Sequence, residues 1–150
     1  MATPLYIENS ILIAAPVSKV WEALTDSHYT KQYMFGCETV SDWTLGSSLI
    51  WRMEYEGQPF IPVTGYILKI DAPHHLTYSV FDPNSTMENI PENYLNVSYD
   101  LTTEGEFTLL KVRQGDYNTV ANGEKRYQDA YNNGLGWSPI LEQIKKILEA

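Results

Sequence analysis

The hydrophobic and polar positions of the chain alternate at first and then change to a helical period. Every second residue of a strand predicted over residues 5–13 falls on one face: Ile7, Asn9, Ile11 and Ile13. The residues between them form the other face, so this strand is expected to bury one side and expose the other.

Two short helices are predicted after this strand. Pro16 stands where a helix can begin, because a proline in the first turn loses no helical hydrogen bond. Apolar residues follow it at helical spacing: Val17, Val20, Trp21 and Leu24. Residues 25–27, with the sequence Thr-Asp-Ser, supply capping oxygens for a second helix that ends near Tyr33.

Five or six further strands follow, separated by turn-forming residues. We predict them over residues 36–43, 49–55, 63–70, 76–81, 94–101 and 107–114. The segment 57–62 is expected to break the chain and residues 82–92 to form a loop, since both contain prolines. Short connections between strands indicate hairpins, and hairpins indicate an antiparallel sheet.

The last part of the chain, from about residue 122 to residue 150, is predicted to be one long helix. An apolar stripe runs along it: Tyr127, Tyr131, Gly134, Trp137, Leu141, Ile144 and Leu148. Pro139 cannot donate a hydrogen bond to the carbonyl of Leu135, so we expect a bend there. A long helix on an antiparallel sheet makes an α+β fold, in which the sheet curls around the helix and leaves a cavity.

The charge balance narrows the choice of partners. The 150 residues include 10 Lys and Arg against 19 Asp and Glu, a net charge of −9 at pH 7. Because such a surface repels phosphates, we expect no nucleic-acid partner. No apolar run approaches the roughly 20 residues of a membrane span, so we expect no membrane insertion.

The chain has one cysteine, Cys37, which excludes an intramolecular disulfide. We expect a single domain over residues 1–150, located in the cytoplasm.

Few residues have the spacing of a catalytic or metal site. His74 and His75 are adjacent and lack the i, i+2 or i, i+4 spacing of a metal-binding pair, so we interpret them as surface histidines and expect no metal. Cys37 has no basic neighbour to lower its thiol pKa and is expected to pack. Gly134 and Gly136 lack the preceding strand of a phosphate-binding loop. We therefore expect no cofactor and assign no catalytic residue.

Aromatic residues make up 13% of the chain, and many fall on faces that this fold turns inward. Aromatic side chains fill cores, and they also line concave ligand pockets. The predicted ligand-binding residues are Trp51, Met53, Tyr55, Tyr78, Val80, Val97, Tyr99, Leu110, Val112, Gln114, Tyr127 and Tyr131. Buried hydroxyl and amide groups need hydrogen-bond partners, so those of this set are expected to orient an otherwise apolar ligand.

The order of several motifs resembles a known superfamily. Residues 15–26, APVSKVWEALTD, look like the opening motif of the superfamily of START domains and Bet v 1-like birch-pollen allergens, also called SRPBCC. Residues 42–46, 65–67 and 71–76 resemble its later landmarks. Residues 133–145, NGLGWSPILEQIK, are similar to the final helix of the branch that resembles the C-terminal domain of the activator of Hsp90 ATPase.

This resemblance implies the helix-grip fold. In that fold a curved antiparallel sheet wraps around a C-terminal helix, two short helices follow the first strand, and a hydrophobic cavity separates sheet and helix. The superfamily contains lipid carriers, hormone receptors and aromatase- or cyclase-like proteins, so the fold does not set the function.

Three functions are compatible with these observations. The first is binding of a small, mostly apolar molecule, such as a lipid, in the cavity. The second is a cyclase- or hydrolase-like enzyme in the same cavity, which needs a general acid or base there. The third is an Hsp90-type co-chaperone module, whose protein partner is a chaperone.

Overall fold

A computed structural model describes residues 5–34, 36–131 and 134–149, and its strands form one antiparallel sheet of seven. In sheet order these are β1 (Ile7–Ile13), β7 (Phe107–Gly115), β6 (Leu95–Glu104), β5 (His75–Val80), β4 (Gln58–Asp71), β3 (Ser48–Tyr55) and β2 (Glu38–Ser41). The first two strands of the sequence therefore lie at opposite edges of the sheet.

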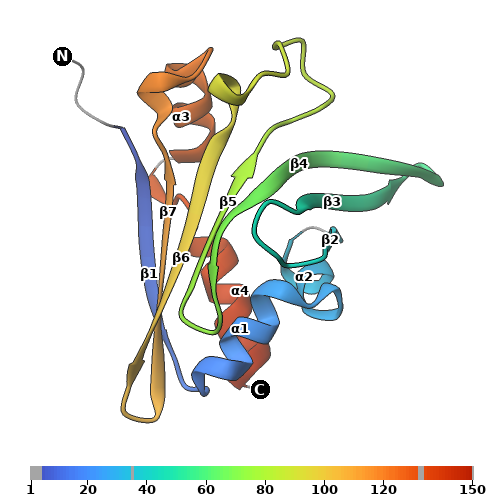
Figure 1. The fold of residues 1–150 in the computed structure, drawn as a ribbon. Coiled ribbons are helices and arrows are strands. Elements are labelled where there is room, and N and C mark those ends of the chain that lie inside the picture. Colours follow the sequence, from blue (N-terminus) through green and yellow to red (C-terminus); the bar gives the residue numbers. More distant parts are fainter. Residues whose placement is uncertain (1–4, 35, 132–133, 150) are drawn as a thin grey trace.

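Two short helices connect these edges, as predicted. Helix α1 (Val17–Thr25) follows Pro16, and helix α2 (Ser27–Tyr33) is capped by Asp26, whose carboxylate accepts a hydrogen bond of 2.8 Å from the His28 amide. The C-terminal helix α4 (Ser138–Glu149) packs against β1 and both short helices. Figure 1 shows the sheet curving past α4, with α1 beside that helix. This arrangement confirms the predicted α+β helix-grip fold.

The core lies between the concave face of the sheet and these helices. Alternation places every second residue of β5 and β6 inside: Leu76, Tyr78, Val97, Tyr99 and Leu101. Helix α4 contributes Leu141 and Ile144 from its apolar stripe. A smaller apolar cluster, with Ile7, Leu95 and Tyr117 at its centre, occupies the other end of the sheet.

The break predicted over residues 57–62 is wrong, because β4 already runs through most of this segment. Strand β3 pairs along this part of β4, whereas β5 pairs with it only over Ile67–Asp71 and through a single bridge at Thr64. The first half of β4 thus has a free side. Pro59 and Pro62 fit there, since a proline on an open strand side costs no sheet hydrogen bond.

The prediction of one continuous C-terminal helix is also wrong. Helix α3 (Gly123–Tyr131) and α4 are separate, and residues 132, 133 and 150 of the predicted helix lie outside the described residues. Gly134 and Gly136 have φ of 93° and 51°, a left-handed conformation that ends a helix. Pro139 is the second residue of α4, where no helical hydrogen bond is lost, so it causes no bend.

An asparagine from the first strand holds the start of α4. The Asn9 Oδ1 accepts a hydrogen bond of 2.9 Å from the Trp137 amide, and its Nδ2 donates one of 3.2 Å to Ser138 Oγ. A Cβ at Gly136 would collide with the Asn9 side chain. Figure 1 shows the consequence: α3 lies near the beginning of β1, while α4 lies across the middle of the sheet.

Two 3-10 turns, η1 (Pro91–Asn93) and η2 (Tyr117–Thr119), complete the described elements. The loop predicted over residues 82–92 contains η1 at its end and otherwise has no helix. Within the described part of the chain, no helix combines the length and the apolar character that crossing a membrane requires.

Candidate functional site

A cavity of about 460 Å³ lies between the concave face of the sheet and the helices. The strands contribute Trp51, Pro62, Val63, Tyr78, Val80, Val97 and Gln114 to its wall. The helices and connecting segments contribute Met34, Cys37, Asp129, Ala130, Gly136, Trp137 and Ile140. Ligand pockets span roughly 300–1,000 Å³ and are mostly apolar, so both the size and the lining are those of a binding site.

A pair of tyrosines supplies one polar point of this wall. The hydroxyl oxygens of Tyr78 and Tyr99 are 2.7 Å apart, and both side chains are buried. Burial raises the pKa of each phenol, so both hydroxyls keep their protons at neutral pH. One hydrogen bond joins them and uses one of the two protons. The Trp51 ring lies 6.4 Å from the Tyr78 ring, which gives the polar pair an aromatic border.

Gln114 supplies a second polar point. Its side-chain oxygen accepts a hydrogen bond of 2.9 Å from the Trp137 indole nitrogen. This bond fixes the orientation of the amide, because the indole can only donate. The Gln114 Nε2 has no hydrogen-bond acceptor among the described residues, and it lies in the cavity wall.

A second cavity of about 390 Å³ adjoins the first. The residues that line both are Val63, Val80, Gln114, Asp129 and Ala130. Its own wall adds Tyr117, which is 1% exposed, and Arg126. Among the described buried side-chain polar atoms, the Tyr117 hydroxyl alone has no hydrogen-bond partner. Leaving such a group unpaired costs about 1–3 kcal/mol.

Opposing effects act on the pKa values of Tyr117 and Arg126. Burial raises the pKa of Tyr117 to about 12, while the Arg126 charge acts in the other direction. Burial lowers the pKa of Arg126, and the neighbouring Tyr117 and Asp82 counteract this. The Arg126 Nη1 donates hydrogen bonds of 3.0 Å to the Asn93 carbonyl and 3.4 Å to the Ala121 carbonyl. Neither carbonyl carries a charge that neutralises the guanidinium.

The structure brings part of the predicted ligand-binding set together. The residues of that set that line the main cavity are Trp51, Tyr78, Val80, Val97 and Gln114. Tyr99, Leu110 and Val112 are buried in the same core behind this wall, and Met53 packs half-buried against it. The period-2 alternation thus places most of these strand residues on the concave side.

Three of the predicted tyrosines do not line the main cavity. Tyr55 is 59% exposed, because it ends β3 at the turn to β4, beyond the core, where its ring contacts Phe60 at a ring distance of 5.9 Å. Tyr131 is 43% exposed and stacks on Tyr127 at a ring distance of 5.4 Å. Tyr127 and Tyr131 belong to α3, which is separate from α4. Tyr127 packs against the smaller cluster, while α3 contributes Asp129 and Ala130 to the wall of the main cavity.

Sequence reasoning missed several residues of the wall. Met34 and Cys37 follow α2, and Ala130 and Ile140 belong to helices, so no strand alternation indicated them. Burial raises the pKa of the Cys37 thiol, which keeps it protonated and packed, as the sequence predicts. Of the carboxyl groups, only Asp129 lies in the described wall of the main cavity, where it is exposed and pairs with Lys125 at 3.1 Å.

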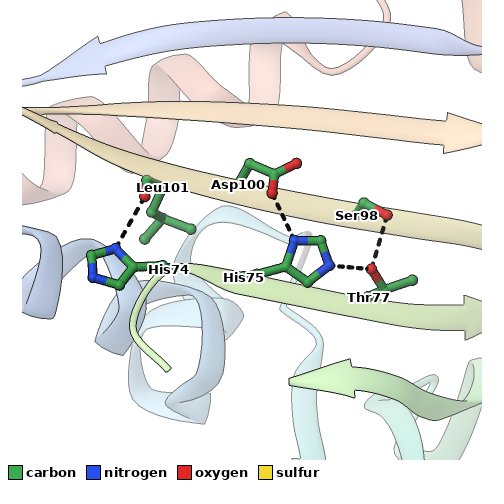
Figure 2. A network of polar contacts seen from close by, with 6 residues as sticks. All are labelled: His74, His75, Thr77, Ser98, Asp100 and Leu101. Atoms are coloured by element: carbon green, nitrogen blue, oxygen red, sulfur yellow. Dashed lines mark hydrogen bonds and ion pairs between the residues drawn. The ribbon is translucent and has the colours of Figure 1, made fainter. Parts of the chain in front are cut away.

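A separate polar network lies on the outer face of the sheet (Figure 2). The His75 Nδ1 is 2.6 Å from Asp100 Oδ1, and its Nε2 is 2.7 Å from Thr77 Oγ1. Thr77 Oγ1 is in turn 3.0 Å from Ser98 Oγ. This order of acid, imidazole and hydroxyl is the one that activates nucleophiles. The network faces away from the cavity, and the described residues contain no group of three or more metal-binding side chains.

The neighbouring His74 is exposed, and its Nδ1 lies 3.3 Å from the Leu101 carbonyl oxygen (Figure 2). His75 is half-buried against its hydroxyl and carboxylate partners. The network therefore ties β5 to β6 across their outer face, and its chemistry is separate from that of the cavity.

Solved structures resemble this fold over nearly the whole chain. ChR145 from Cytophaga hutchinsonii is 35% identical with a TM-score of 0.77, covering 99% of this chain and 97% of that one. The HSP90 activator PFC0360w from Plasmodium falciparum is 15% identical with a TM-score of 0.66, covering 97% and 96%. Aha1 from Colwellia psychrerythraea, solved as a dimer, is 18% identical with a TM-score of 0.69, also covering 97% and 96%.

A search of curated proteins gives no match. A family model does match, over residues 14–149, and its description is "Activator of Hsp90 ATPase homolog 1-like protein". The match extends from the end of β1 to the end of α4 and so includes both sides of the cavity. The chain therefore belongs to the family of Activator of Hsp90 ATPase homolog 1-like proteins.

Proposed function

We propose that the protein binds a small, mostly apolar molecule in the main cavity. The observation that carries this proposal is the cavity of about 460 Å³ with its largely apolar wall. Protein interiors are close-packed and contain few voids larger than a water molecule, whose share of liquid volume is roughly 30 Å³. A space of this size in a helix-grip fold is best explained by a ligand that fills it.

The binding energy would come from burial of apolar surface, at roughly 25 cal/mol per Å². The Tyr78 hydroxyl and the Gln114 amide would orient the ligand, since a few polar groups in an apolar pocket usually set the binding pose. Because burial and not charge drives the binding of a neutral ligand, added salt should change its affinity little.

The test uses the neutral dye Nile red and a pair of variants on α3. Ala130 lines the cavity, so Ala130→Trp fills part of it, whereas Gln128 is exposed on the same helix and is not part of the wall. We expect saturable dye binding that shifts the amide resonances of Val97 and Gln114. Ala130→Trp should weaken binding by roughly tenfold or more, and Gln128→Trp should leave it unchanged. Binding that is equal in both variants, or shifts confined to the outer face, would contradict the proposal.

A second candidate function comes from the family description and from PFC0360w, which is named as an HSP90 activator. We propose as this second function that the chain binds an Hsp90 chaperone and stimulates its ATPase. Adding the chain to Hsp90 should then raise the rate of ATP hydrolysis, and an unchanged rate together with no complex on a sizing column would exclude this function. The two functions are independent, because the first concerns the cavity and the second a protein surface.

The structure offers less for the enzyme alternative. A cyclase or hydrolase in this cavity needs a positioned acid or base. Three titratable side chains lie in the described wall of the main cavity: burial keeps Cys37 and Tyr78 protonated by raising the pKa of each, and Asp129 is exposed and already paired with Lys125. No observation therefore favours catalysis in this cavity over binding.

A further inference from the structure

The second cavity continues the first toward α3 and differs from it in chemistry. The two share a wall formed by Val63, Val80 and Ala130, with Gln114 between them. Whereas the main cavity is mostly apolar, the second is lined by Tyr117 and Arg126 and, at its exposed side, by Asp82 and Asp129. A ligand that fills the first cavity can therefore reach polar groups in the second.

Tyr117 is the first sign that this end of the space receives a polar group. Its side chain is 1% exposed, and its hydroxyl has no hydrogen-bond partner among the described residues. Buried polar groups in native proteins are nearly always paired, so this unpaired hydroxyl, buried directly behind the cavity wall, indicates a missing partner. The ring is held by an edge-to-face contact with Tyr127, at a ring distance of 5.6 Å.

Arg126 is the second sign. It is half-buried, and among the described residues its guanidinium donates hydrogen bonds from Nη1 alone, to the backbone carbonyls of Asn93 and Ala121. No ion pair joins it to a carboxylate of the described residues. The remaining nitrogens of the guanidinium form a planar fork of donors, which suits a carboxylate.

Gln114 adds a third donor. Because its oxygen is occupied by the Trp137 indole, it presents the Nε2 group, which has no acceptor among the described residues. The second cavity is thus lined by a phenol, a guanidinium and an amide NH₂, all in need of an acceptor.

The two carboxylates in the same wall each have a closer partner than Arg126, although the Asp82 charge still acts on the guanidinium from a distance. Asp82 accepts a hydrogen bond of 2.8 Å from the Asn84 amide, and Asp129 pairs with Lys125 at 3.1 Å. Both are exposed, so water screens their charge more than it screens that of the half-buried Arg126.

We propose that the ligand is an apolar carboxylic acid, whose carboxylate binds Arg126, Tyr117 Oη and Gln114 Nε2 while its apolar body occupies the main cavity. This inference rests on the proposed ligand-binding function and names the chemical class of the ligand. Arg126 lies on α3, so this helix would recognise the polar end of the ligand.

The experiment compares three probes with one tail: decanoate, decanol and decylamine, each titrated into the full chain by calorimetry. Without a site for the head group, decanol would bind best, because it is the least hydrated of the three. A charge-assisted hydrogen-bond site should reverse this order and make decanoate roughly tenfold or more tighter.

Matched variants locate the preference. Arg126→Met keeps an apolar stem and should abolish the preference for decanoate without weakening decanol, and Tyr117→Phe should reduce that preference several-fold. Lys146→Met and Tyr66→Phe are the controls, since both side chains are exposed and neither lines the two cavities. In the unmodified chain, carbon NMR of carboxyl-labelled decanoate should show that binding lowers the pKa of the acid.

The outcomes separate the two proposals. If decanoate and decanol bind equally well, or decylamine binds best, the carboxylate assignment is overturned and the apolar cavity stands. A preference for decanoate that survives Arg126→Met, or an acid whose pKa does not fall on binding, also overturns it. If none of the three probes binds, the proposed ligand-binding function fails together with this inference.

Discussion

The two faces of the strand pair β5 and β6 have opposite chemistry although their residues alternate along the same strands. The concave face carries Leu76, Tyr78, Val97 and Tyr99, which build the core and the cavity wall. The convex face carries His75, Thr77, Ser98 and Asp100, which form the polar network of Figure 2. Each face has its own side-chain hydrogen bonds between the strands.

These hydrogen bonds are similar in length but not in consequence. The Tyr78 and Tyr99 hydroxyls pair at 2.7 Å inside the protein, where water cannot replace a lost partner. The His75 and Asp100 side chains pair at 2.6 Å on the surface, where water can. Burial, and not geometry alone, therefore decides how strongly each of these polar pairs contributes to stability.

The largest loss of stability is expected at alkaline pH, where the buried tyrosines of the concave face and of the smaller core cluster must ionise. Burial raises the pKa of Tyr33, Tyr78, Tyr99 and Tyr117, the last to about 12. Unfolded tyrosine ionises near pH 10, so the unfolded chain releases these protons first. Stability should therefore be complete below about pH 10 and fall as the pH rises toward about 12 and beyond.

Denaturant unfolding at a series of pH values, followed by tyrosinate absorbance, measures this loss. The Tyr78→Phe variant is the control, because removing one buried phenol should make the alkaline decline shallower. A free energy of unfolding that stays constant from about pH 9 to about pH 12 would show that these phenols are accessible to water.

The next effect compares consecutive residues of β5. Leu76 is 0% exposed, and Leu76→Ala should lower the free energy of unfolding by about 4 kcal/mol, within the range of about 2–5 kcal/mol for such sites. Thr77 lies on the convex face, so Thr77→Ala should cost less than about 1 kcal/mol. Urea unfolding of both variants tests this, and losses of equal size would mean that the two faces are not distinguished by burial.

A smaller effect is expected from the buried tyrosine pair. Tyr78→Phe leaves the Tyr99 hydroxyl without its partner and should cost about 1–3 kcal/mol. Replacing both tyrosines with phenylalanine removes both polar groups and should cost less than the sum of the two single changes. A double-mutant cycle measures this coupling, and strictly additive losses would show that the hydroxyls do not depend on each other.

The smallest effect is expected on the convex face. Asp100→Asn removes the charge beside His75, and because this pair is partly exposed it should cost less than about 1 kcal/mol at neutral pH. Repeating the unfolding at high salt should make the difference vanish. A loss above about 2 kcal/mol would place the convex network among the main stabilising contacts, and the contrast between the faces would not hold.

Local sequence patterns predicted most of the strands, both short helices and the buried face of several strands. Alternation in β1 and around Tyr78 and Val97 predicted their buried faces, and Pro16 and Asp26 marked the two short helices. These patterns depend on neighbours a few residues apart, which is why they can be read without the fold. The motif order also indicated the superfamily and, through it, the helix-grip fold.

Packing between distant elements sets where the chain turns between α3 and α4 and which polar groups meet. Asn9 of β1 stabilises the turn before α4, because its Oδ1 accepts a hydrogen bond from the Trp137 amide. These two residues are distant in the sequence. The second cavity likewise joins Gln114 at the end of β7, Tyr117 in η2 and Arg126 in α3. No local period links these positions. Their meeting depends on how separate elements pack, and so does the chemistry that the cavity can recognise.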